Sequence, residues 1–246
     1  MTFQYGIVAI IVVLLVIIFL WKGIKKIAAW ALLIILAIAL FGTVFGLDLF
    51  NDITDITENF PTARKLFLLN DDGIRAGFEL SVLGTGDVSF IDAKTLTSYQ
   101  SSLKDLDAVR GDYYKLIIID AKAFTVNNLS INGNDLSASQ VLEVIRSDNP
   151  RERAVDFIRS SQSLPDTPEV RRYIEKQLKD SSIETDADMR ASLFAQLFVA
   201  EMGKSPLSLT RGMTQSTITI YPETITFKVI KILPESITEK IIQNLQ

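Results

Sequence analysis

Two long apolar stretches open the chain, at residues 5–21 and 27–47, and only a short lysine-containing turn separates them. At about 1.5 Å rise per residue, a helix over the second stretch crosses a hydrocarbon core of about 30 Å. The first stretch is shorter and reaches across with the help of residues 3–5 at the interface. The pattern therefore predicts a hairpin of two transmembrane helices, with the lipid bilayer as its first partner.

The charges that flank these stretches predict how the hairpin is oriented. Lys22, Lys25 and Lys26 lie in the turn, whereas residues 48–63 contain several acidic residues and neither Lys nor Arg. Because lysines near the ends of spans are retained on the cytoplasmic side, we expect the turn in the cytoplasm and both termini outside it. The chain is then a two-pass protein of the plasma membrane. The alternative is a hairpin inserted the other way round.

Small residues recur along one face of the second span. They are Ala31, Ala39, Gly42 and Gly46, and the last two have the G-x-x-x-G spacing that allows two helices to approach closely. We expect the first span to pack on this face, because a short turn makes the two spans neighbours. A second copy of the chain is the alternative, which would make a homo-oligomer. Neither span contains an ionisable side chain, so an ion pathway is not expected.

Beyond an acidic stalk over residues 48–61, the pattern changes to short alternating and apolar runs. Strands are predicted at 65–69, 74–83 and 88–91, with turn residues between them, and together they form a β-meander. A helix follows from Leu96 to Leu106, and a strand is predicted at 113–124. Its central residues are apolar at consecutive positions, which predicts burial on both faces in the middle of a sheet.

The middle of the chain is predicted to be a helical lobe over about residues 136–204. Four helix starts are marked by capping residues, namely Ser137, Asn149, Thr167 and Thr185. Alternation returns at 216–221 and 224–232, which predicts a β-hairpin, and a last amphipathic helix is predicted to begin at Pro234. The fold class is α+β: a transmembrane hairpin and then a mixed domain over 62–246.

Composition removes several kinds of chemistry. The chain of 246 residues contains no Cys and no His, which excludes disulfides, thiolate catalysis, imidazole bases and zinc sites built on these ligands. No cofactor is expected. The net charge of −4, with no basic run beyond the turn, makes nucleic acid an unexpected partner. A Cys-free domain outside the cytoplasm also leans towards a prokaryotic source.

Carboxylates are the remaining candidates for site chemistry. Asp120 ends the predicted central strand, and Asp71 and Asp72 lie in the first turn of the meander, so a divalent cation shared among them is conceivable. No cation-loop signature is present around them. The simpler interpretation is that Asp71 and Asp72 form a turn and Asp120 terminates a strand, because Asp favours such positions through its own hydrogen bonds.

These observations lead to one expected function and two alternatives. A well-specified domain without a reactive constellation predicts a non-enzymatic binding or assembly module of the cell envelope, anchored in the membrane and facing outwards. Its expected partner is another envelope or membrane protein. The alternatives are a hydrolase outside the cytoplasm that uses carboxylates or a divalent metal, and an accessory subunit of a membrane transport or secretion complex.

Overall fold

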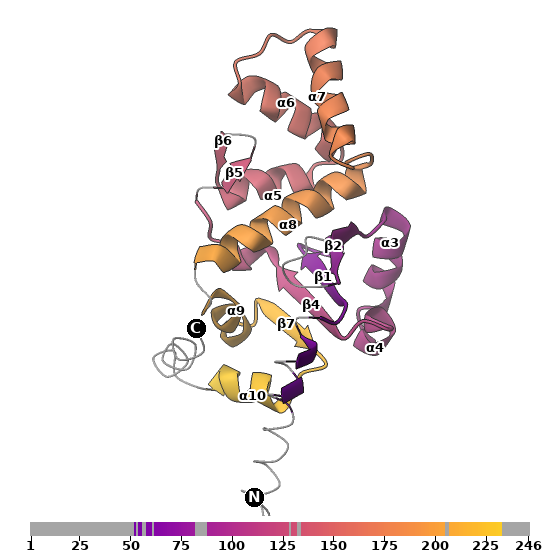
Figure 1. Cartoon of the computed structure of the whole chain (residues 1–246), viewed down its shortest axis with the longest axis vertical. Coiled ribbons are helices and arrows are strands. Elements are labelled where there is room, and N and C mark those ends of the chain that lie inside the picture. The colour runs from indigo at the N-terminus through magenta and orange to yellow at the C-terminus, as the bar shows by residue number, and fades with distance from the viewer. Residues whose placement is uncertain are drawn as a thin grey trace, which may run out of the picture. The chain divides into compact units, whose positions relative to one another are not determined.

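The computed structural model describes residues 52, 54–55, 58–60, 62–81, 88–127, 129–131, 134–204 and 207–232. The chain divides into two compact units, Met1–Thr54 and Asp55–Gln246, and every helix and strand labelled in Figure 1 belongs to the second. Among the described residues, no helix is long and apolar enough to cross a membrane. The predicted spans lie outside them, with the turn and small-residue positions Lys22, Lys25, Lys26, Ala31, Ala39, Gly42 and Gly46.

A five-stranded sheet organises the second unit, in the order β3-β2-β1-β4-β7. Its strands are β1 (Lys65–Asn70), β2 (Ile74–Leu80), β3 (Val88–Phe90), β4 (Lys115–Asp120) and β7 (Ile218–Tyr221). The first three strands are antiparallel neighbours, as the predicted meander requires. Strand β4 runs parallel to β1 and antiparallel to β7, so its predicted position inside the sheet is confirmed.

Both faces of the β1–β4 pair are buried, because apolar residues occupy consecutive positions in each strand. One face carries Leu66, Leu68 and Leu116, which pack under α3 (Ala93–Ser102) and α4 (Leu106–Arg110). The other face carries Phe67, Leu69, Ile117 and Ile119, which join the larger core under the remaining helices. The sheet is therefore the central layer of the domain (Figure 1).

Four helices follow in succession on the larger core. They are α5 (Ala138–Arg146), α6 (Pro150–Ser161), α7 (Pro168–Asp180) and α8 (Asp186–Lys204). The predicted caps at Ser137 and Thr167 are confirmed, since each side chain accepts a hydrogen bond from the first turn of its helix. The prediction for α6 is confirmed in part: Asn149 is the N-cap residue and Pro150 the first helical residue, but the Asn149 side chain makes no capping bond.

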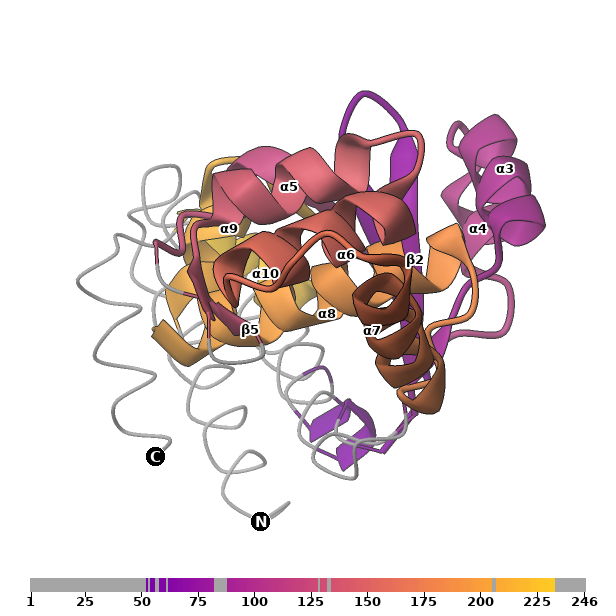
Figure 2. The same cartoon turned by 90° about the horizontal axis from the view of Figure 1, so that it is seen from above.

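The helices form two layers above the sheet. Helices α5 and α8 lie on the sheet, and the α6–α7 hairpin lies above them, farther from the strands (Figures 1 and 2). Aromatic contacts fix α8 to the sheet, with ring centroids 5.1 Å apart for Phe78 and Phe194 and 4.8 Å apart for Phe67 and Phe198. Helix α8 therefore supports both layers.

The predicted C-terminal β-hairpin is wrong. Strand β7 is present, but its expected partner at 224–232 is the helix α10 (Ile225–Ile232). Ile225 and Val229 fit a helical spacing with Ile232 and an alternating one with Phe227, so the pattern is ambiguous in a short run. The predicted helix from Pro234 lies outside the described residues.

Several shorter elements differ from the sequence-based expectation. The predicted helix 96–106 is two helices, because the Asp105 side chain accepts a bond from the amide of Ala108 and starts α4. The predicted strand 113–124 ends at Asp120 and continues as the 3-10 turn η1 (Ala121–Ala123). The hairpin of β5 (Leu129–Ile131) and β6 (Asn134–Leu136) and the helix α9 (Leu207–Thr214) are additional to the predicted elements.

Two lysines are buried side by side at the start of the parallel strands. Lys65 and Lys115 are register partners and expose 0% and 2% of their surface. The Lys65 Nζ donates to the Phe60 carbonyl oxygen at 2.5 Å, and the Lys115 Nζ donates to the Pro222 carbonyl oxygen at 3.0 Å. Burial lowers the pKa of Lys65. Through these two bonds, the lysine pair holds residues 58–60 and the β7–α10 turn against the start of the parallel strands.

The lowered pKa of Lys65 predicts a pH-dependent stability. Between that pKa and the ordinary lysine pKa of about 10.4, the unfolded chain holds a proton that the folded chain has released, so the free energy of unfolding increases with pH. Lys65→Met should remove this increase; because it also removes the bond to the Phe60 carbonyl oxygen, the slope of the free energy of unfolding with pH is the readout. Urea titrations between pH 7 and 10 test this, with exposed Lys94→Met as control. An unchanged slope in Lys65→Met contradicts the prediction.

Candidate functional site

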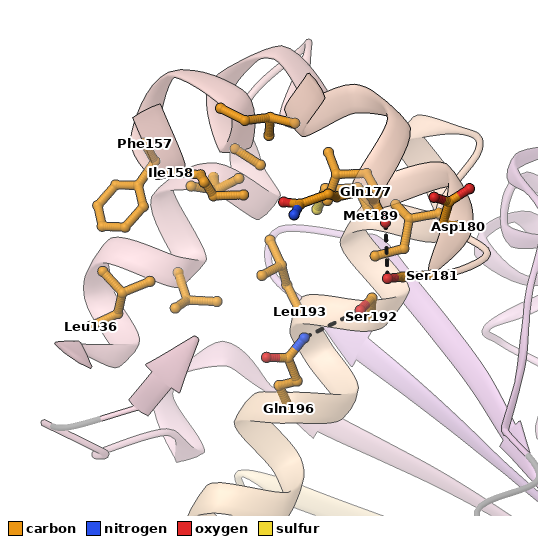
Figure 3. A pocket seen from close by; sticks show the side chains of 16 residues that line it. Leu136, Phe157, Ile158, Gln177, Asp180, Ser181, Met189, Ser192, Leu193 and Gln196 are labelled. Carbon is orange, nitrogen blue, oxygen red and sulfur yellow. Dashed lines mark hydrogen bonds between the residues drawn. The ribbon is translucent and has the colours of Figure 1, made fainter. Parts of the chain in front are cut away.

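A cavity of about 700 Å³ lies among the helices α5, α6, α7 and α8. Figure 3 shows side chains from both helical layers pointing into it. Most of its wall is apolar and buried, with a contribution from β6. These apolar lining residues are Leu136, Val141, Val144, Ala154, Phe157, Ile158, Ile174, Leu178, Ile183, Met189 and Leu193.

The polar lining residues lie on the α7 and α8 side of the cavity. They are Gln177, Asp180, Ser181, Ser192 and Gln196, and all of them are exposed or half-buried. In Figure 3, Leu136, Phe157 and Ile158 lie at the opposite side from Asp180 and Ser181. The cavity therefore has an apolar side and a more exposed polar side, which we call the mouth.

The α6–α7 hairpin forms the roof of the cavity and is fixed at its outer end by ion pairs. The Arg171 guanidinium lies 2.7 Å from an Asp156 carboxylate oxygen on α6 and 2.8 Å from one of Asp166 in the connecting loop. Helix α7 makes its main helix contacts with α6. Helix α6 is also fixed to the lower layer, because Arg153 pairs with Glu143 of α5 and the Arg151 amide donates to Asp186 at the start of α8.

The floor of the cavity is fixed more firmly. Arg190 on α8 donates from Nε to the Ile145 carbonyl oxygen at 3.1 Å and from its terminal nitrogen to the Ser147 carbonyl oxygen at 2.9 Å. These bonds satisfy carbonyl groups at the C-terminal end of α5, which lack partners within their own helix. Buried Glu201, near the other end of α8, accepts from the amide of Thr125 at 2.7 Å. Helices α5 and α8 are thus a rigid support.

The polar groups at the mouth keep hydrogen-bonding capacity. The Ser181 hydroxyl donates to the Gln177 backbone carbonyl at 3.0 Å, and the Gln196 amide donates to the Ser192 hydroxyl at 3.3 Å. The Gln177 side-chain amide donates to the Tyr173 hydroxyl at 2.9 Å. Each glutamine amide keeps a second N–H and the Ser192 hydroxyl keeps its O–H. Within the part of the chain that the structure describes, the Asp180 carboxylate has no hydrogen bond or ion pair. The mouth therefore offers both donors and acceptors.

The cavity is open to solvent, so water can fill it where it finds polar partners. Its apolar side chains offer a surface against which an apolar ligand group could be buried.

Asp180 is the one ionisable residue among the side chains that line the cavity. Burial of an apolar group and hydrogen bonding at the mouth are what this arrangement offers.

The carboxylates of the predicted cation site do not gather at one point. Asp71 binds Arg146 on α5 through two bonds of 2.6 and 3.1 Å, and Asp72 is exposed in the turn. Asp120 accepts from the amide of Lys122 at 2.9 Å and caps η1. The β1–β4 register brings Asp71 and Asp120 to the same end of the sheet. Among the described residues, however, no three acidic side chains gather as a metal site would require.

Comparison of the chain with family models, curated proteins and solved structures found no match. The cavity and the residues that line it are therefore the main evidence on function.

The sequence predicted the burial of some residues that line this cavity. Ile174 and Leu178 belong to the apolar stripe of α7, and Met189 and Leu193 belong to the nearly all-apolar α8, so each is predicted to be buried. A stripe that packs against a neighbour and one that lines a cavity look alike in sequence. The one available signal is the placement of polar Gln177, Ser192 and Gln196 among these apolar residues.

The capping role of Asp120 gives a test against metal binding. Asp120→Asn keeps an oxygen that accepts from the Lys122 amide, so its stability should match wild type, whereas Asp120→Ala should lose about 1 kcal/mol. Urea unfolding of both variants measures this. If Asp120 were a metal ligand, Mg²⁺ or Ca²⁺ would stabilise wild type, and both variants would lose that added stability.

Proposed function

We propose that this chain is a membrane-anchored binding module without enzymatic activity, and that its ligand site is the cavity among α5–α8. One observation carries the proposal, namely a cavity of about 700 Å³ whose lining residues are mostly apolar, with polar side chains from α7 and α8. Ligand sites typically have volumes of about 300–1,000 Å³, mainly apolar walls and a few polar groups that orient the ligand.

The sequence supports the second part of the proposal, which concerns location. Two apolar stretches at 5–21 and 27–47 anchor the chain, and the lysines between them favour a cytoplasmic turn. The domain then lies outside the cytoplasm, close to the membrane surface. In this position it binds its ligand at the cell envelope and contacts a protein partner there, with the small-residue face of the second span available for helix packing.

Photolabelling of the full chain in lipid nanodiscs tests the cavity. An apolar diazirine probe, adamantyl diazirine, should label peptides of α6–α8 as well as the membrane hairpin. Ser192→Trp places a large ring at the mouth, and Ala154→Leu fills part of the interior from α6. Each should reduce labelling of α6–α8 at least about tenfold, which corresponds to about 1.4 kcal/mol of binding free energy. Peptide mass spectrometry gives the label at each site.

Ser101→Trp is the matched control, because Ser101 is exposed on α3 beside the other face of the sheet. It should leave labelling of α6–α8 unchanged, and labelling of the hairpin serves as the internal standard in every variant. Equal labelling of α6–α8 in Ser192→Trp, Ala154→Leu and Ser101→Trp would show that the probe does not enter the cavity and would reject the proposal.

The location outside the cytoplasm has a separate test. Ser182 is exposed between α7 and α8 and has a positive φ of 62°, so a small side chain is tolerated there and a thiol would be accessible. Because the chain has no native cysteine, Ser182→Cys gives a single reactive site. We expect a membrane-impermeant maleimide to label intact cells and lysed cells equally. Labelling only after lysis would place the domain in the cytoplasm.

A further inference from the structure

We propose that the outer edge of β3 pairs with β3 of a second copy of this chain, in antiparallel orientation about a two-fold axis. This pairing joins two five-stranded sheets into one and buries an apolar groove that lies beside β3 in each copy. Three features of the edge lead to the proposal: the outward hydrogen-bonding groups of β3, the apolar groove, and the lack of charged residues in its lining.

Strand β3 presents backbone groups without a partner at the edge of the sheet. Among the described residues, its strand partner is β2 alone. The Ile91 amide donates to the Gly77 carbonyl oxygen of β2 at 3.0 Å, and successive residues of an antiparallel strand face that neighbour alternately. Ser89 therefore faces β2 as Ile91 does, and the N–H and C=O groups of Val88 and Phe90 point outwards. The described part of the chain provides no hydrogen bond for these outward groups.

The sequence of β3 does not protect this edge. Proteins commonly keep strand edges from pairing with lysine, proline or inward-pointing charges, and Val88, Ser89 and Phe90 are none of these. The strand is short, so it offers few hydrogen bonds to a partner. The side chains beside it therefore have to contribute to any pairing.

An apolar groove of about 410 Å³ extends from this edge onto α8. Val88 and Phe90 line it from the strand, and Ala195, Val199 and Ala200 line it from the helix. Val88 is 38% exposed and Val199 is 68% exposed, which is unusual for large apolar side chains in the described part of the chain. Side chains at alternate positions of a strand share one face. A strand added to β3 thus places its own apolar side chains beside α8, where they cover Val199.

A second copy is the occupant that the charge of the groove favours. Identical surfaces carry identical charges, and like charges placed opposite each other destabilise a strand pair. A surface can therefore pair with itself only where it carries little charge, and no residue that lines this groove is ionisable. An antiparallel pair of identical strands also has two-fold symmetry, which is the commonest symmetry of homo-oligomers.

The size of the contact indicates that it forms between membrane-anchored copies. A three-residue strand and one groove offer less than the roughly 1,200 Å² that stable interfaces in solution bury. Anchoring both copies in one bilayer raises their effective concentration, which compensates for a small contact. This step rests on the membrane anchor proposed above, whereas the geometry of the pairing does not.

The hydrogen-bonding pattern determines which residues lie on the axis. An axis at Ser89 pairs all three residues of β3, with Val88 of one copy bonded to Phe90 of the other and the two Ser89 residues directly opposite. Because Ser89 faces β2, it forms a non-hydrogen-bonded pair with Cα atoms about 4.5 Å apart, within the range of about 4.4–6.8 Å that a disulfide spans. Ser89 is exposed, and the chain has no native cysteine.

Oxidative crosslinking of the full chain in liposomes tests the pairing. We expect Ser89→Cys to form a disulfide-linked dimer at least about tenfold faster than Ser182→Cys, which is equally a surface site but lies between α7 and α8. Adding Val199→Lys to Ser89→Cys introduces like charges at the groove of both copies and should slow crosslinking at least about tenfold. Adding Tyr173→Lys, at a 59% exposed position on α7, should leave the rate unchanged. Non-reducing gel electrophoresis measures the dimer.

The outcomes separate this inference from the proposed function. Equal crosslinking rates for Ser89→Cys and Ser182→Cys, or equal rates after Val199→Lys and Tyr173→Lys, would overturn the pairing. A disulfide adduct of Ser89→Cys with another protein in native membranes, without a dimer, would assign the edge to a foreign strand and overturn the second copy. Flotation of the liposomes measures the membrane anchor separately, and labelling of α6–α8 by adamantyl diazirine measures the cavity separately.

Discussion

The burial of the parallel strands β1 and β4 on both faces is the constraint on which the domain depends. Leu66, Leu68 and Leu116 point to one face, and Phe67, Ile117 and Ile119 point to the other, so both faces have to be covered. The short helices α3 and α4 cover the first face, and α5, α8 and α9 cover the second. The parallel pairing also brings Lys65 beside Lys115 at the base of the sheet, where carbonyl groups of Phe60 and Pro222 accept from the two ammonium groups.

Covering the sheet explains the first layer of helices but not the second. The α6–α7 hairpin lies above α5 and α8, away from the strands (Figure 2). Its packing on the lower helices is incomplete and leaves the cavity of about 700 Å³. The hairpin also takes part in the main core, because Ala154, Ile158 and Ile174 belong to the same cluster of buried residues as the sheet. The cavity therefore lies where one continuous core is incompletely packed.

The elements best predicted from the sequence are those with strong local signals. Ser137 and Thr167 start helices through side-chain bonds that depend on neighbouring residues, and the apolar run of β4 predicts its interior position. The apolar residues within 225–232 fit both a helical and an alternating spacing, and contacts with the rest of the fold decide which structure forms. The cavity was not predictable, because it arises from the spacing between helices. For Asp120, the pattern correctly placed a strand end, and the structure shows that its carboxylate serves as a cap.

Hydrogen exchange of the full chain with and without adamantyl diazirine, kept in the dark, tests the central claim most directly. If the cavity among α5–α8 is the ligand site, this probe should slow amide exchange in α7 and in the part of α8 around Ser192 and Gln196, which line the cavity. Exchange in β1 and β4 should change little, since their burial does not depend on the ligand. Slower exchange confined to other elements, or no change in α7 and α8 at saturating ligand, would contradict the account.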